Sequence, residues 1–86
     1  MIIVSQDKVA NINYNNIEAI YMLKKDDKIE INVRGNYDYT IGKYETEERA
    51  KEVLQEIVSK YKTTLYNSKT NETVVNIPKV YEMPTK

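Results

Sequence analysis

The sequence predicts an α+β fold in which an antiparallel β-meander of about five strands packs against one amphipathic helix and is followed by an extended C-terminal tail. Two patterns support this class. Along residues 46–62, apolar side chains recur at the spacing of one helix face, at Ala50, Val53, Leu54, Ile57, Val58 and Tyr61. Before them, short β-branched and Tyr-rich runs alternate with turn-forming Asn, Asp and Gly. A helix of this length is marginal alone in water, so its stripe must pack against those strands.

Polar turns divide the first part of the chain into strands. Residues 2–4 form a short β-branched run that ends at the turn 5–7, and residues 9–13 alternate loosely before an Asn-rich turn. Residues 17–25 form a longer strand that is apolar on both faces, a property of central strands and of oligomer contacts. We expect its core face to carry Ile17, Ala19, Tyr21 and Leu23, and its opposite face to carry Ile20 and Met22.

The next hairpin can be argued from the alternation of side chains. Asp26-Asp27 is a turn, and residues 28–33 alternate strictly, with Ile29, Ile31 and Val33 inward and Lys28, Glu30 and Asn32 outward. A one-residue slip would turn every side chain to the wrong face. We therefore expect a three-residue loop, Arg34-Gly35-Asn36, that pairs Val33 with Tyr37, Ile31 with Tyr39 and Ile29 with Ile41, after which Gly42 ends the strand.

The helix is expected to begin after Thr46, whose hydroxyl can accept a hydrogen bond from a first-turn N–H, and to end near Lys62. Leu54 is expected at the centre of its buried stripe, facing Ile31, Tyr39 and Ile41. Residues 1–66 then form the meander and helix, and residues 67–86 form a polar loop and an extended arm of the same domain. Pro78 and Pro84 cannot donate to a ladder, which confines this segment to a sheet edge or to an extended arm.

The composition argues against an enzyme. The chain has no Cys and no His, which excludes thiolate nucleophiles, imidazole bases and zinc sites, and its two glycines form no phosphate-binding loop. The tightest acidic pair, Asp26-Asp27, lies in a predicted turn and supplies too few oxygens for calcium. We expect no catalytic residue, no metal and no cofactor.

A nucleic-acid partner is not favoured either. The 13 basic and 13 acidic residues cancel, so no global field attracts a phosphate backbone. The alternative is a nucleic-acid-binding accessory protein that uses Tyr and Lys on the meander, because Tyr can stack on bases. The basic residues near the meander are Lys24, Lys25, Lys28, Arg34 and Lys43, with acidic residues among them.

No apolar run approaches the length of a membrane span, and the start of the chain lacks the basic region of a signal peptide. These features predict a cytoplasmic protein that does not contact membranes.

Four stretches resemble a group of short, uncharacterised proteins of Firmicutes and their phages or prophages. They are MIIVSQDK at the start, the Asn-rich turn before IEAIYM, the junction GKYETEERAKEVLQEI, and VYEMP near the end. The resemblance implies a β-meander packed on a helix and a bacterial or phage-infected cell, and it brings no assigned catalytic residue. A fainter similarity, in the order of strands before one helix, is to pleckstrin-homology-like domains.

The function expected from the composition and the strand pattern is a non-enzymatic protein-interaction module or homo-oligomer. The resemblance implies an accessory role in a phage or prophage, acting on a host component. Its partners would be a second copy of the chain, a bacterial host protein, or both. One helix can cover only one face of a meander, so the opposite face and the tail are the candidate contacts. The residues expected there are Ile20, Met22, Val75, Ile77, Tyr81 and Met83. The tail could equally fold back on its own sheet.

Overall fold

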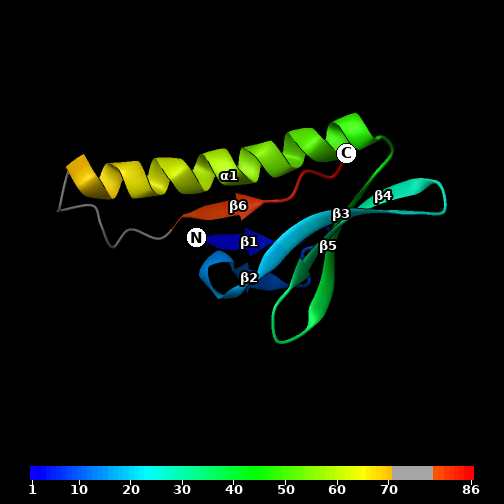
Figure 1. The fold of residues 1–86 in the computed structure, drawn as a ribbon, viewed down its shortest axis with the longest axis horizontal. Coiled ribbons are helices and arrows are strands. Elements are labelled where there is room, and N and C mark those ends of the chain that lie inside the picture. The colour runs from blue at the N-terminus through cyan, green and yellow to red at the C-terminus, as the bar shows by residue number, and fades with distance from the viewer. Residues whose placement is uncertain (71–78) are drawn as a thin grey trace.

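A computed structural model describes residues 1–70 and 79–86, with the side chains of 1–62 and 79–86. It confirms the α+β class. The described residues form six strands, one short 3-10 helix and one long α-helix (Figure 1). The elements in chain order are β1 (Ile2–Val4), β2 (Asn11–Asn13), η1 (Tyr14–Asn16), β3 (Ala19–Lys25), β4 (Lys28–Arg34), β5 (Asp38–Tyr44), α1 (Glu47–Thr70) and β6 (Val80–Glu82).

The strands divide between two small sheets. β3, β4 and β5 form an antiparallel sheet with β4 at its centre, which is the meander that the sequence predicts. β1 is the centre of the second sheet, antiparallel to β2 and parallel to β6. Figure 1 shows α1 along the length of the molecule, with β6 between the helix and β1. The core lies where the helix and the two sheets meet, and its buried side chains are Ile3, Ile29, Ile31, Val33, Ile41, Tyr44, Ala50, Val53, Ile57 and Met83.

The faces of β3 are the reverse of the prediction. Directly paired residues of an antiparallel sheet share a face. Ile20 pairs with Val33 and Met22 with Ile31, so both lie on the core side and pack against the core. The two-residue turn Asp26-Asp27 sets this register, because it pairs Lys25 with Lys28. Asp26 adopts a φ of 56°, the left-handed conformation that such turns require.

The hairpin between β4 and β5 has the predicted loop length but begins one residue later, at Gly35. Arg34 pairs with Asp38 and Val33 with Tyr39, which leaves Tyr37 in the loop and exposed. A bulge at Ile41 then lets the strand continue, so that Gly42 pairs with Ile31. The predicted pairings of Val33, Ile31 and Ile29 are therefore wrong. Gly42 also does not end the strand, which continues to Tyr44.

The position of Gly42 has a steric reason. A Cβ atom at this residue would lie 2.9 Å from the Tyr44 ring and 3.1 Å from Cε of Met83. Both of those side chains are buried. The missing side chain thus makes room for the tyrosine ring and for the C-terminal methionine in the same layer of the core.

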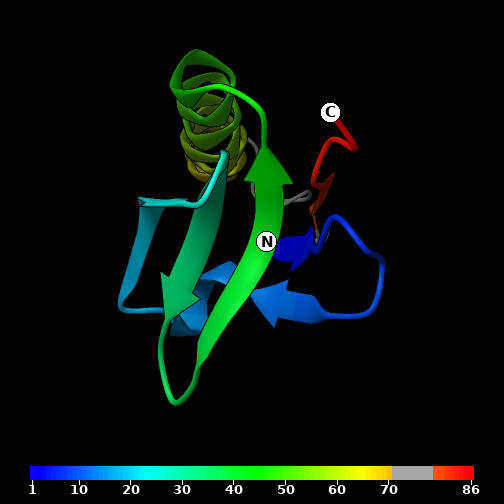
Figure 2. The same cartoon turned by 90° about the vertical axis from the view of Figure 1, so that its right-hand side faces the viewer.

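The helix begins as predicted and turns a different face to the core. Thr46 Oγ1 accepts a hydrogen bond from the Arg49 N–H at 3.1 Å, which confirms the N-cap. The fully buried positions are Ala50, Val53 and Ile57, whereas Leu54 is only half-buried. Leu54 is therefore not the centre of the stripe. The contact is narrow because the helix crosses one end of the β3–β4–β5 sheet (Figure 2).

The helix is also longer than the sequence predicts. It extends to Thr70, past the predicted end near Lys62 and into the predicted polar loop. At its middle, the Tyr61 ring packs on Tyr14 of η1, with ring centroids 4.7 Å apart. The helix therefore contacts the segment that leads into β3 as well as the sheet.

Candidate interaction site

Of the residues predicted to form an interaction site, the four that the structure describes belong to the core or pack against it. Ile20 and Met22 lie on the core side of β3, so the premise that they line an uncovered face is wrong. Val75 and Ile77 lie outside the described residues. Tyr81 and Met83 belong to the C-terminal segment, where β6 pairs with β1 of the same chain. Met83 is 1% exposed and is part of the core.

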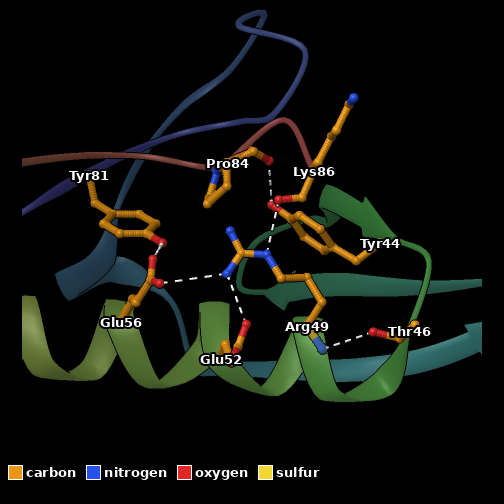
Figure 3. Close-up of polar contacts among 8 residues, drawn as sticks. All are labelled: Tyr44, Thr46, Arg49, Glu52, Glu56, Tyr81, Pro84 and Lys86. Carbon is orange, nitrogen blue, oxygen red and sulfur yellow. Dashed lines mark hydrogen bonds and ion pairs between the residues drawn. The ribbon is translucent and has the colours of Figure 1, made fainter.

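The C-terminal segment is held by a polar cluster on α1 (Figure 3). Arg49 Nε donates to the Lys86 carbonyl oxygen at 2.9 Å, and its Nη1 donates to Glu52 Oε1 at 3.1 Å. The same nitrogen lies 3.7 Å from Glu56 Oε2. The Tyr81 hydroxyl donates to Glu56 Oε1 at 2.6 Å. One helix face therefore fixes both β6 and the residues after it.

Two tyrosine hydroxyls in this region are kept protonated. Burial raises the pKa of Tyr44 to about 12. Burial also raises the pKa of Tyr81 well above its ordinary value, and the nearby Glu56 carboxylate adds to the effect. The Tyr44 hydroxyl donates to the Pro84 carbonyl oxygen at 2.7 Å. Both groups therefore act as hydrogen-bond donors at neutral pH, which suits a role in attaching the C-terminal segment.

A groove of about 870 Å³ lies between α1 and β6 and is lined by Arg49, Glu52, Gln55, Glu56, Ser59, Lys60, Lys79 and Tyr81. Its central groups already bind one another: Arg49 pairs with Glu52 and Glu56, and Tyr81 donates to Glu56. The local sequence pattern does not indicate this cluster. Its signal was the i,i+3 pair Arg49 and Glu52 at the start of the helix, which resembles ordinary surface charge.

Gln6 connects three parts of the fold, a role that no local sequence pattern indicates. Its N–H donates to the Ile41 carbonyl oxygen at 2.8 Å. Its side-chain Oε1 accepts from the Lys43 N–H at 2.8 Å, and Nε2 donates to the Lys43 carbonyl oxygen at 3.0 Å. Nε2 also contacts the carbonyl oxygens of Pro84 and Thr85, each at 3.1 Å. A glutamine amide thus pairs with the edge of β5 as a neighbouring strand would.

The β3–β4–β5 sheet has one face turned away from the core, which we call the outer face. It carries Tyr21, Leu23, Glu30, Asn32, Arg34 and Thr40. The Arg34 guanidinium lies 5.3 Å from the Tyr21 ring centroid, and Leu23 is about half exposed. Glu30 and Asn32 are buried on this face because β4 is central, and Asn32 Oδ1 has no hydrogen-bond partner within the described residues.

The same sheet has an open edge along β3. Among residues 1–70 and 79–86, the strand order places β3 at the margin with β4 on one side only, and Figure 2 shows no other strand of this part of the chain beside it. We call the side of β3 that faces away from β4 the free edge. The opposite margin, β5, is occupied in part by Gln6. Edge strands of this kind present unpaired main-chain groups to other chains.

The acidic residues show no metal-binding arrangement in residues 1–70 and 79–86: no three carboxylates are grouped as ligands there. Within the same ranges, no helix is both long enough and apolar enough to cross a membrane.

Comparison of this chain with protein-family models, with curated proteins and with solved structures found no match.

Proposed function

We propose that this chain is a non-enzymatic protein-interaction module whose binding element is the β3–β4–β5 sheet, through its free edge and its outer face. The observation that supports this proposal most directly is the position of β3. Within the part of the chain that the structure describes, this strand of seven residues stands at the margin of a three-stranded sheet with a partner on one side only. Pairing with another strand would satisfy its remaining main-chain groups and extend the sheet.

The side chains near this edge support protein binding as well. Tyr21 and Leu23 give the outer face an apolar margin, and Arg34 beside Tyr21 adds a polar contact. Aromatic residues and arginine are the types enriched at protein interfaces. The balanced charge of the chain favours a protein partner over a phosphate backbone.

The partner we propose is a second copy of the chain, a bacterial host protein, or both. The resemblance of the sequence to phage and prophage proteins supports a bacterial cytoplasmic setting and an accessory role in an infected cell. Homo-oligomerisation is the form that purified protein can test directly.

The experiment combines light scattering after size exclusion with hydrogen exchange, from low micromolar to near-millimolar concentration. We expect the mean mass to rise with concentration, together with protection of the Met22 amide. The Tyr21 amide is the internal control, because its residue pairs with β4 in the monomer and should be protected throughout. A constant monomer mass, with Met22 exchanging rapidly both alone and with bacterial lysate added, would refute the proposal.

A further inference from the structure

We propose that two copies of this chain pair antiparallel through β3, with Tyr21 of each copy on the two-fold axis, to form one continuous sheet. This inference rests on the proposed function, since it names the partner and the register of the same edge. It follows from three features of β3: the direction of its main-chain groups, the charges at its two ends, and the side chains at its middle.

The two-residue turn determines which main-chain groups are free. In such a hairpin the residues that flank the turn, Lys25 and Lys28, form a hydrogen-bonded pair, and every second residue of β3 then bonds to β4. Ile20, Met22 and Lys24 consequently direct their N–H and C=O groups toward the free edge. The Glu18 N–H already donates to the Arg34 carbonyl oxygen at 2.7 Å, so the stretch with free main-chain groups begins at Ile20.

These groups allow only a few symmetric registers. Antiparallel partners share a face, so residues of β3 that face the free edge must pair with one another. With Tyr21 on the axis, Ile20 pairs with the partner's Met22, and Met22 with the partner's Ile20. With Met22 on the axis, Ile20 would instead pair with the partner's Lys24, which places a charge beside an apolar side chain.

Charge selects between these registers. Glu18 precedes the strand, Lys24 lies near its end, and both side chains are exposed. With Tyr21 on the axis, Glu18 lies beside the partner's Lys24, and the symmetry repeats this attraction at the other end. With Met22 on the axis, Glu18 would lie beside the partner's Asp26 and repel it. Lysine on an edge strand normally opposes pairing with another strand. Of these two registers, the one with Tyr21 on the axis places a carboxylate, Glu18, beside the partner's Lys24.

The side chains at the centre agree with this register. Tyr21 would lie beside the partner's Tyr21 in a non-hydrogen-bonded pair, where side chains approach most closely. Leu23, about half exposed in the monomer, would lie beside the partner's Ala19, whose small side chain leaves room for it. Aromatic pairs across strands stabilise a sheet, so the contact between the two Tyr21 rings would add to the stability of the dimer.

Cysteine cross-linking tests the register, because the chain contains no cysteine. Tyr21→Cys would place two Cα atoms about 4.5 Å apart, within the range that a disulfide spans. The matched control is Leu23→Cys on the same face. In this register the two Leu23 positions lie about 13 Å apart along the strands, too far for a disulfide. We expect Tyr21→Cys to form a disulfide dimer under mild oxidation, and Leu23→Cys to remain uncross-linked.

Charge reversal tests the same register without a disulfide. Glu18→Lys and Lys24→Glu each replace two attractive pairs by two repulsive pairs, so each should raise the dimer dissociation constant about tenfold. The double variant restores both attractions and should return to within about threefold of the unaltered chain. Because both side chains are exposed, we expect all three variants to fold, which circular dichroism would verify.

The outcomes separate this inference from the proposed function. Cross-linking through Leu23→Cys in place of Tyr21→Cys, or a double variant as weak as the single ones, would overturn the register while the chain still associates. A chain that is monomeric at every concentration and fails to cross-link would overturn the dimer, and rapid exchange of the Met22 amide with bacterial lysate added would overturn the proposed function as well. Cross-linking at Tyr21 with rescue by the double variant would support the dimer.

Discussion

Gln6→Ala provides a sharp test of how the two sheets and the C-terminal segment are held together. The substitution removes the side-chain bonds to Lys43, Pro84 and Thr85 and retains the main-chain bond to Ile41. The amide nitrogen has only two hydrogens for its three carbonyl acceptors, so they share its donation. The Pro84 contact is partly buried and the others are exposed to water.

The expected loss follows from these contacts. A neutral hydrogen bond contributes about 0.5–1.5 kcal/mol net, and exposed bonds fall at the low end because water replaces them. Gln6→Ala should therefore lower the free energy of unfolding by about 1–3 kcal/mol, which corresponds to about 4–20 °C in Tm for a domain of this size. Gln55→Ala is the matched control: Gln55 is exposed on α1, and its loss should stay within about 0.5 kcal/mol.

Urea unfolding followed by circular dichroism measures the global effect, and hydrogen exchange at the Lys43 amide measures the local one. Gln6→Glu separates the two roles of the side chain, because it retains the acceptor for the Lys43 N–H and loses the donor to the carbonyl oxygens. We expect fast Lys43 exchange in Gln6→Ala and slow exchange in Gln6→Glu, with both variants destabilised. Equal stability of Gln6→Ala and Gln55→Ala, with unchanged Lys43 exchange, would refute the reasoning.

Three further predictions concern the core and the response to acid. Ile57→Ala should lower the free energy of unfolding in urea by about 2–5 kcal/mol, because Ile57 is fully buried. Val58→Ala should lower it by less than about 1 kcal/mol, because Val58 is 39% exposed. The reverse order would mean that the helix turns a different face to the core. Gly42→Ala should lower Tm, because the added Cβ would meet a buried tyrosine ring at 2.9 Å, and an unchanged Tm would contradict this packing. Hydrogen bonds lower the pKa of Asp7 and Glu82 below their ordinary values of 3.8 and 4.5. These two carboxylates therefore stabilise the folded chain fully above those values, and this contribution is lost as the pH falls through their lower, folded-state pKa. Acid titration of the Asp7→Asn/Glu82→Gln variant should therefore show a smaller loss of stability below pH 4 than the unaltered chain, and equal losses would count against this assignment.

The sequence by itself determined the elements whose signals are local. The stripe of residues 46–62, the Thr46 cap, the alternation of residues 28–33 and the Asp26-Asp27 turn each depend on neighbours a few positions away. Periodicity and turn chemistry act over that range, so the α+β class followed from them. The sequence also showed which chemistry is missing, since a chain without His and Cys has no imidazole or thiol.

Only the tertiary structure decided which faces are covered and where the edges lie. β3 is apolar on both faces, so the alternation of its side chains does not show which face is buried. The pairing of Ile20 with Val33 and of Met22 with Ile31 turns Ile20 and Met22 inward. The bulge at Ile41 moved Gly42 and Tyr44 into the core, which a regular ladder does not predict. Ile57 is buried in place of Leu54 because the helix crosses only one end of the β3–β4–β5 sheet (Figure 2), and the helical stripe by itself does not show which of its residues meet that end. Contacts such as Gln6 with Pro84 join residues 78 positions apart, and no local pattern encodes a separation of that length.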